Sequence, residues 1–79
     1  MPTLRLFAQA REAAQTSVDD VPGATVAEVL DVAEHRYGPT FSDVLGTCRV
    51  WVNGEPADRS TTVVDTDEVA VLPPVSGGC

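Results

Sequence analysis

The residues of this chain that could do chemistry are few and stand far apart. Two cysteines, Cys48 and Cys79, are separated by thirty-one positions, and His35 is the single histidine. A structural zinc site needs three or four ligands, and a catalytic nucleophile needs a neighbouring base. This set therefore predicts neither a metal centre nor a catalytic constellation, and Cys48, in the β-rich run 48–52, is expected to be a small core residue.

The last residues have a different character, because 73–79 read Pro-Pro-Val-Ser-Gly-Gly-Cys. Glycine has no side chain, so a diglycine can pass through a narrow pocket with its backbone close to the walls. Two prolines give a stiff exit from the preceding domain, and residues 75–78 would reach roughly 13 Å when extended. We expect a mobile arm that carries its end into another protein.

Length and charge limit the possible classes of function. The 79 residues allow one domain, expected over 1–74, with a tail over 75–79. Twelve acidic residues against five basic ones give a net charge of −7, which disfavours nucleic acid as a partner and favours a basic protein surface. No apolar run approaches the ~20 residues of a membrane-spanning helix, and no signal peptide is evident, so a cytoplasmic protein without membrane contact is expected.

Hydrophobic patterning indicates which elements position the tail. The helix signal is clearest, because Thr25 and Glu28 form a capping box, an apolar face follows, and Gly38 with Pro39 ends it. Strands are predicted over 3–9, 16–21, 48–53 and 68–72, and 57–64 is expected to be a weaker strand or an irregular return. A loop is predicted over 11–15, a further helical turn over 41–45 and a turn at Asn53-Gly54.

This order of elements predicts the fold class. One main helix crossing a mixed sheet in so short a chain gives a two-layer α+β roll. The first and last strands can then lie side by side and parallel at the centre of the sheet. That arrangement is the β-grasp, or ubiquitin-like, roll.

Strand alternation also predicts a docking face. If Leu4, Leu6 and Ala8 point toward the helix, Phe7 points away from it. The same reasoning for the third and last strands turns Trp51 and Leu72 outward. Any one of these could be an ordinary exposed hydrophobe, but three of them beside the tail indicate a partner surface, to which we add Arg11.

Three segments carry a resemblance to a known family. They are Leu6-Phe7-Ala8-Gln9-Ala10-Arg11-Glu12, the Val52-Asn53 turn, and the run from Asp67 through Pro73-Pro74 to Gly77-Gly78. Together they make the chain similar, over essentially its whole length, to the MoaD/ThiS family of sulfur carriers and above all to small subunits of molybdopterin synthase. Two departures are Thr66, where the family usually has glycine, and Cys79 after the diglycine.

The resemblance implies a carrier without catalytic activity or bound cofactor. In the family, a ubiquitin-activating-like adenylyltransferase uses ATP to activate the terminal glycine carboxylate, here that of Gly78, which then becomes a thiocarboxylate. Ser76 and Gly77 would enter the synthase large subunit, where the sulfur passes to a pterin precursor of the molybdenum cofactor. Because Cys79 follows Gly78, a processing protease is expected to cleave between them.

Several alternatives remain open from the residues. The carrier could serve thiamine, cysteine or secondary-metabolite synthesis, since partner choice lies in surface detail. The chain could instead be a ubiquitin-like modifier of lysines, or a plain interaction domain with an inert tail. A persulfide on Cys79 is an alternative to its removal.

Overall fold

Residues 1–73 are described by this computed structural model, and in them short strands alternate with helices. Pro74 and the predicted tail over 75–79 lie outside the described residues. In chain order the elements are β1 (Thr3–Leu6), α1 (Ala8–Ala14), β2 (Val18–Asp20), α2 (Val26–Tyr37), α3 (Pro39–Leu45), β3 (Arg49–Val52), β4 (Glu55–Ala57) and β5 (Glu68–Leu72).

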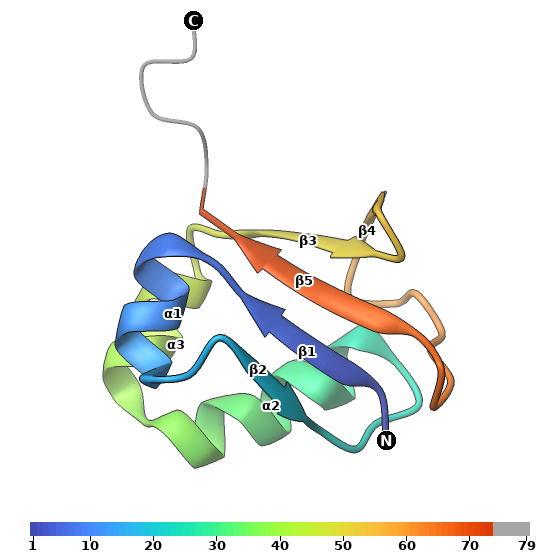
Figure 1. Cartoon of the computed structure of the whole chain (residues 1–79), viewed down its shortest axis with the longest axis horizontal. Helices are drawn as coiled ribbons and strands as arrows, with labels where there is room; N and C mark the ends of the chain where they lie inside the picture. The colour runs from blue at the N-terminus through green and yellow to red at the C-terminus, as the bar shows by residue number, and fades with distance from the viewer. Residues whose placement is uncertain (74–79) are drawn as a thin grey trace, which may run out of the picture.

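The strands form one mixed sheet with the order β2-β1-β5-β3-β4 (Figure 1). β1 and β5 run parallel at its centre, with Leu4 opposite Val69 and Leu6 opposite Val71. β2 pairs with β1 and β3 pairs with β5, both antiparallel. The parallel pairing of the first and last strands confirms the predicted β-grasp roll.

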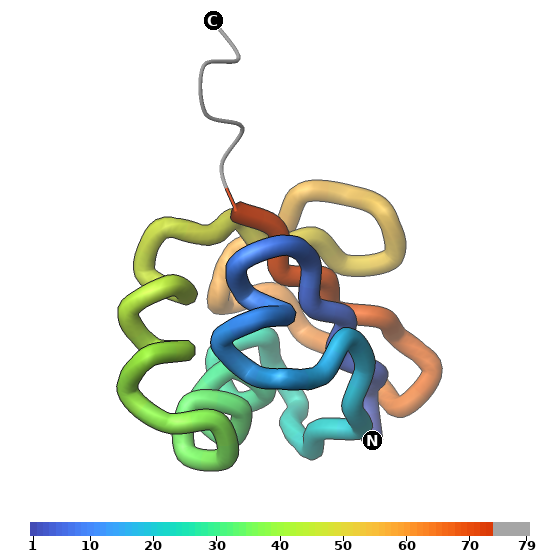
Figure 2. Tube along the Cα trace, turned by 60° about the vertical axis from the view of Figure 1, so that its left-hand side comes forward, coloured from blue at the N-terminus to red at the C-terminus, as the bar shows by residue number. Residues whose placement is uncertain are grey.

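The helices lie on one side of the molecule, and the strands of the sheet lie on the other (Figure 2). The core fills the space between them, so the side chains of β1 and β5 alternate between buried and more exposed. Burial of each large apolar side chain stabilises the fold by about 1.5–3 kcal/mol. The fully buried residues include Leu4, Leu6, Val69 and Val71 from the sheet and Val26, Val29, Leu30, Ala33 and Phe41 from the helices.

The start of α2 is fixed by the predicted capping box. The Thr25 hydroxyl accepts a hydrogen bond from the Glu28 backbone N–H at 3.3 Å, and the Glu28 carboxylate accepts one from the Ala24 N–H at 3.0 Å. At the other end Gly38 adopts φ 93°, a conformation that favours glycine. Pro39 then occupies the first turn of α3, where its missing N–H is not needed, so the predicted single turn is a helix of seven residues.

The largest error of the sequence analysis lies between β1 and β2. The predicted strand over 3–9 stops at Leu6, and α1 replaces both its end and the predicted loop over 11–15. Ala8 is exposed instead of pointing inward, and Ala10 is buried in its place. The segment is rich in Ala, Gln, Arg and Glu, which are strong helix formers, but it buries too few side chains to produce a helical pattern.

Two weaker segments differ in how much strand they form. The predicted strand over 16–21 is confined to Val18–Asp20. Of the two expectations for 57–64, the irregular return is the one found, since β4 covers Glu55–Ala57 and the return contributes one isolated bridge between Thr25 and Thr62. Within residues 1–73, no helix is both long and apolar enough to cross a membrane.

Candidate functional site

The uncovered side of the sheet carries two cross-strand rows of side chains. In the first row Arg5, Ala70 and Trp51 stand opposite one another on β1, β5 and β3. Val18 on β2 pairs with Arg5 and extends this row to the sheet edge. Because side chains alternate along a strand and Leu4, Val69 and Val71 are buried, this row points away from the helices.

The second row lies two residues further along β5, at Leu72. Leu72 pairs with Arg49 across β3 and β5. Phe7 follows β1 with extended backbone angles, φ −123° and ψ 150°, and its N–H donates to the Val71 carbonyl at 3.2 Å. Phe7 therefore continues the alternation of β1 beside Leu72, with 41% of its surface exposed. We call the two rows, made of Arg5, Phe7, Val18, Arg49, Trp51, Ala70 and Leu72, the outer face.

The structure places the three predicted docking residues on one side of the sheet, as the strand alternation predicts. Phe7, Trp51 and Leu72 all lie on it, although Trp51 and Leu72 are half-buried. Arg11 is exposed in the last turn of α1, and its N–H reaches the Phe7 carbonyl at 3.4 Å, so it stands at the border of this face. Sequence reasoning missed Val18, which is 50% exposed, because the acidic residues after it weaken the strand pattern.

Charges of both signs lie on this side of the sheet. Glu68 and Asp20 follow the alternation of Ala70 and Val18, while Arg11 and Arg49 stand near its Leu72 end. Arg5 is paired with Glu68 at 2.6 Å. In the part of the chain that the structure describes, Arg11 and Arg49 take part in none of the three ion pairs. Local complementarity therefore favours acidic groups on a partner at the Leu72 end of this face, whereas net charge alone had favoured a basic surface.

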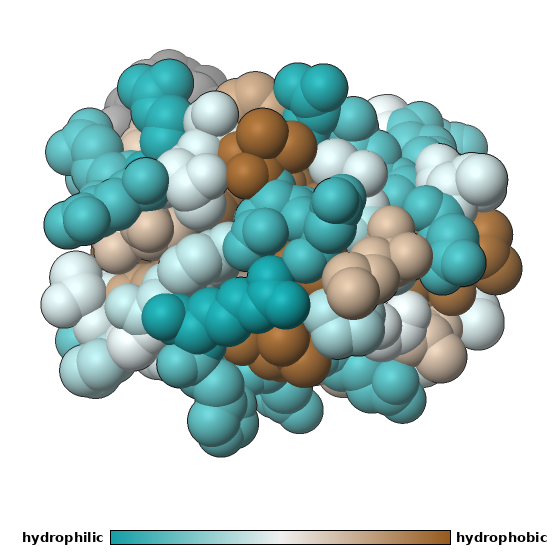
Figure 3. Space-filling view, turned by 60° about the horizontal axis from the view of Figure 1, so that its bottom comes forward, coloured by the Kyte–Doolittle hydropathy of each residue, from teal (hydrophilic) through white to brown (hydrophobic). Residues whose placement is uncertain are grey.

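Another side of the molecule has a different composition. Figure 3 shows the side that lies at the bottom of Figure 1, where hydrophilic residues dominate and apolar residues form small separate patches. Such scattered apolar residues are normal on a soluble domain. The outer face differs because Leu72 and Trp51 lie on the neighbouring strands β5 and β3, and Phe7 directly follows β1 on the other side of β5.

Side-chain hydrogen bonds of Asn53 and Asp67 connect the turn after β3 to the turn before β5. The Asn53 amide donates to the Asp67 carboxylate at 2.8 Å, and its oxygen accepts from the Glu68 N–H at 2.9 Å. The hydrogen bond from Asn53, together with one from the Val64 N–H, lowers the pKa of Asp67. Asn53 has φ 51° and Gly54 φ 82°, as the predicted turn requires. These contacts fix the strand register on which the outer face depends.

A second polar cluster fastens β2 to α2. The Tyr37 hydroxyl and the Arg36 guanidinium both donate to the Asp19 carboxylate, the latter at 3.0 Å. The Tyr37 hydrogen bond is the main cause that lowers the pKa of Asp19, while burial and the same carboxylate raise the pKa of Tyr37. Because the Asp19 carboxylate accepts hydrogen bonds from both side chains, we assign this cluster a structural role.

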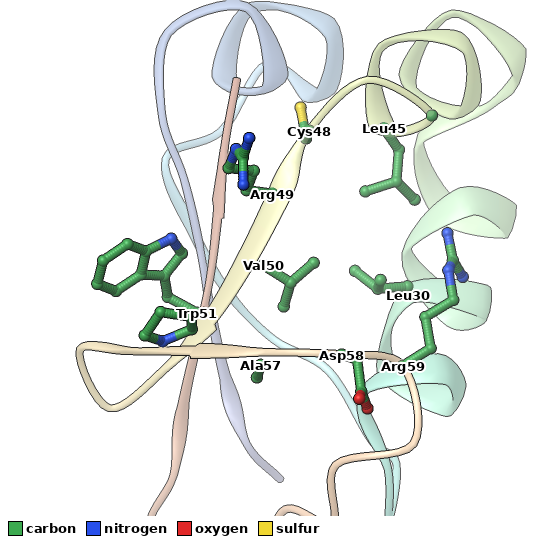
Figure 4. A pocket seen from close by; sticks show the side chains of 11 residues that line it. Leu30, Leu45, Cys48, Arg49, Val50, Trp51, Ala57, Asp58 and Arg59 are labelled. Carbon is green, nitrogen blue, oxygen red and sulfur yellow. The ribbon is translucent and has the colours of Figure 1, made fainter. Parts of the chain in front are cut away.

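Cys48 lies beside a hollow of about 380 Å³ between β3–β4 and the helices. Figure 4 shows Val50, Leu30 and Leu45 pointing into this hollow, with Trp51 and Arg49 on the other side of β3. The Cys48 thiol is half-buried and donates to the Val44 carbonyl at 3.2 Å, and burial raises its pKa. Cys48 thus packs against the core, as predicted.

The tail residues named by the sequence analysis, Ser76, Gly77, Gly78 and Cys79, lie outside the described residues. The structure places only the point from which they follow, Leu72 and Pro73 at the end of the outer face. No group of three or more potential metal ligands gathers among residues 1–73. The described domain therefore offers a contact surface at the base of the tail.

Two curated proteins are similar to this chain, and both are named molybdopterin synthase sulfur carrier subunit. The one from Phaeosphaeria nodorum is 36% identical over 59 residues, which span 65% of this chain and 62% of that protein. The one from Arabidopsis thaliana is 35% identical over 78 residues, which span 92% of this chain and 78% of that protein.

Solved structures give the same fold. The crystal structure of SAMP1 from Haloferax volcanii is 36% identical, with a TM-score of 0.78 over 96% of this chain and 97% of that one. CysO in the Amycolatopsis orientalis BexX/CysO complex is 25% identical, with a TM-score of 0.82 over 99% and 100% of the two chains. A sequence model described as the ThiS family matches residues 4–78. The chain therefore belongs to the ThiS family of ubiquitin-like sulfur carriers.

Proposed function

We propose that this chain is the sulfur carrier subunit of a molybdopterin synthase, with Gly78 as the residue that bears the sulfur. The observation that carries the proposal is the outer face, which ends at Leu72, from where the sequence continues through Pro73 toward the diglycine. A partner that binds Phe7 and Leu72 is positioned to receive the residues that follow Pro73. The names of the curated relatives and the family match through residue 78 support this assignment.

The chemistry assigned to the tail needs an activated carboxylate. A free carboxylate is a poor electrophile, because its oxygen is a poor leaving group. Transfer of AMP from ATP turns that oxygen into a leaving group, and a sulfur nucleophile can then displace AMP to give a thiocarboxylate. The ATP belongs to a ubiquitin-activating-like adenylyltransferase, and the sulfur would pass to the pterin precursor in the synthase large subunit.

We assign catalysis to these partners and not to the carrier. Among residues 1–73 the only histidine, His35, is exposed on α2, and its Nδ1 contacts the Asp31 backbone carbonyl at 2.9 Å. Cys48 carries a raised pKa and contacts a backbone carbonyl. Neither side chain meets a partner of the kind that a nucleophile and its base require.

The test of this function is conversion of the chain ending at Gly78 by a cognate activating enzyme, ATP and a sulfur source. Intact mass spectrometry should record the gain expected when sulfur replaces one carboxylate oxygen, and omission of ATP should prevent it. Addition of the synthase large subunit and pterin precursor should then return the carrier to its carboxylate form. No mass change under any of these conditions would favour an inert interaction domain.

A second candidate is a ubiquitin-like modifier, favoured by the 36% identity to Haloferax volcanii SAMP1, a small archaeal modifier protein. In that case the activated Gly78 would form isopeptide bonds with lysines of other proteins. Isopeptide-linked adducts in the native host, without accumulation of thiocarboxylate, would select this candidate. Carriers for thiamine, cysteine or secondary metabolites share the first step and differ only in the acceptor.

The docking role of the outer face can be tested with two substitutions. Phe7→Ala and Leu72→Ala should each raise the Kd for the large subunit or the activating enzyme about 5- to 30-fold, which corresponds to ~1–2 kcal/mol at a buried contact. Isothermal titration calorimetry would measure the Kd. The melting temperature of Phe7→Ala should stay near that of the parent, because Phe7 lies outside the core.

Val64→Ala is the matched control, because Val64 is 60% exposed and is not part of the outer face. It removes a similar exposed apolar side chain and should leave the Kd unchanged. Equal Kd values for Phe7→Ala, Leu72→Ala and the control would contradict docking at the outer face.

A further inference from the structure

The hollow of about 380 Å³ between the β3–β4 hairpin and the helices has an apolar floor. Val50 and Ala57 are opposite one another in the β3–β4 ladder, and Val50 also pairs with buried Val71, so both face the helices. Figure 4 shows Val50 pointing across the hollow toward Leu30 and Leu45. Val50 and Ala57 are nevertheless only half-buried, because no side chain of the domain fills the space over them. A hollow of this size can receive an apolar side chain from another molecule.

Arg59 places a positive charge at the rim of this hollow. Its backbone carbonyl accepts a hydrogen bond from the Ala27 N–H at 3.0 Å, which holds the residue beside α2. Figure 4 shows the exposed Arg59 side chain extending past Leu30. Among residues 1–73 Arg59 takes part in none of the three ion pairs. Its guanidinium can therefore bind a carboxylate, which matches its fork of N–H donors with two parallel hydrogen bonds.

The neighbouring carboxylate, that of Asp58, is occupied by other donors. Its Oδ1 accepts hydrogen bonds from the Ser60 N–H at 2.9 Å, from the Ser60 hydroxyl at 2.5 Å and from the Thr61 hydroxyl at 3.4 Å. The bonds from Ser60 are the main cause that lowers the pKa of Asp58. Figure 4 shows this carboxylate pointing away from Val50. The hollow thus combines an apolar floor with a guanidinium, which suits a ligand that has an aliphatic group next to a carboxylate.

The hollow and the outer face meet at the start of β3. β4 pairs with Val50–Val52 and does not extend to Arg49, so the first residue of β3 has no strand beside it on this edge. Arg49 borders the hollow, while on the outer face it stands opposite Leu72. A protein bound at the Leu72 end of the outer face can therefore pass a segment around this edge into the hollow. This continuity favours a segment of a protein over a free small acid.

We propose that the hollow is a second contact site for the protein that docks on the outer face, and that it receives an acidic-aliphatic segment of that protein. One aliphatic side chain of the segment lies over Val50 and Ala57, and an adjacent Asp or Glu carboxylate pairs with Arg59. The identity of the partner rests on the function proposed above, whereas the binding of such a segment by the hollow does not.

The direct test uses the blocked tripeptide acetyl-Glu-Leu-Glu-amide and the isotopically labelled full chain, residues 1–79. Amide NMR shifts of Val50, Ala57 and Arg59 should change together with one Kd of about 1 mM. Acetyl-Gln-Leu-Gln-amide lacks the carboxylates, and acetyl-Glu-Ala-Glu-amide lacks the aliphatic side chain. Each should bind at least about fivefold more weakly, since each loses one of the two contacts.

Two substitutions in the chain separate the same contacts. Ala57→Leu adds a side chain that occupies the hollow beside Val50, and Arg59→Gln removes the positive charge. Each should raise the Kd of acetyl-Glu-Leu-Glu-amide at least about fivefold. Ala24→Leu is the matched control, because Ala24 is exposed before α2 and does not line the hollow, so it should leave the Kd unchanged. Melting temperatures verify folding, and Arg59→Gln, at an exposed side chain, decides the test even if Ala57→Leu unfolds the chain.

Three results would overturn the site. The first is the absence of a saturable shift at Val50, Ala57 and Arg59 with acetyl-Glu-Leu-Glu-amide. The second is an equal Kd of this tripeptide for the parent and Arg59→Gln. The third is tighter binding of the free acid 4-methylpentanoate than of the tripeptide, which would assign the hollow to a small molecule.

A separate arm identifies the partner by calorimetry with the synthase large subunit. Ala57→Leu and Arg59→Gln should each raise the Kd of this complex about 3- to 10-fold, and Ala24→Leu should not. A large subunit that binds the parent and both hollow variants equally would overturn the assignment of the hollow to this interface. A large subunit that does not bind the parent would contradict the proposed function, and the tripeptide result would still decide whether the hollow binds an acidic-aliphatic segment.

Discussion

Removal of Gly78 from the chain that ends at this residue is expected to reduce thiocarboxylate formation by at least about 100-fold. The deletion withdraws the terminal carboxyl by ~3.4 Å, about one residue of extended chain. Misplacement of a reacting group by ~1 Å can already cost a factor of 10² in rate. The measurement is intact mass after incubation with the activating enzyme, ATP and a sulfur source.

Two variants of unchanged length serve as controls. Ser76→Gly keeps the diglycine and the reach of the tail, so it should retain activity. Gly78→Val keeps the length but adds a branched side chain at the activated residue, so it should fail as the deletion does. Unaltered melting temperatures are expected for all three variants, because the residues changed follow the folded domain. Normal conversion of the Gly78 deletion would refute the assignment of the sulfur-bearing residue.

The elements that the sequence predicts well are those whose signals are local. The capping residues Thr25 and Glu28 make the hydrogen bonds that their spacing indicates, and the apolar face of α2 is buried. β5 covers the predicted residues 68–72, because its alternation is complete and a turn and Pro73 mark its two ends. Where capping residues, turn residues and hydrophobic period all indicate the same element, that element also forms in the folded domain.

The failures come from segments in which packing decides the structure. Helix α1 buries Ala10 and little else, so its residues give no helical period, and the predicted strand before it extends falsely to Gln9. The Asp19 contacts to Arg36 and Tyr37 join residues seventeen and eighteen positions apart, and no local pattern predicts them. Such contacts depend on how β2 lies against α2.

The candidate site was predicted only in part, because some of its residues are placed by local strand period and others by the pairing of distant strands. Alternation placed Phe7, Trp51 and Leu72 on one face, because strand period is a local property. It could not predict that Val18 joins them, since this depends on the antiparallel register of β1 and β2. Nor could it predict that Arg5, Arg11 and Arg49 come together there, because they lie on three separate elements.

The last prediction concerns Cys79. The full chain should give no thiocarboxylate at Gly78 until Cys79 is removed. The reason is chemical: the Gly78 carbonyl is in a peptide bond to Cys79, so Gly78 has no carboxylate to adenylate. The chain ending at Gly78 should react without a protease, at a rate at least about 100-fold higher than the full chain.

Cys79→Ser separates removal from a role of the thiol itself. If Cys79 is only a residue to be cleaved, the serine variant should stay inactive when uncleaved and become fully active once truncated after Gly78, since the product is identical. If instead the Cys79 thiol carries sulfur as a persulfide, the uncleaved parent would transfer sulfur and the serine variant would not. Protein isolated from its native host should accordingly be lighter than the full chain by one cysteine residue. Active native protein that retains Cys79 would rule out the cleavage, because its Gly78 would still be an amide.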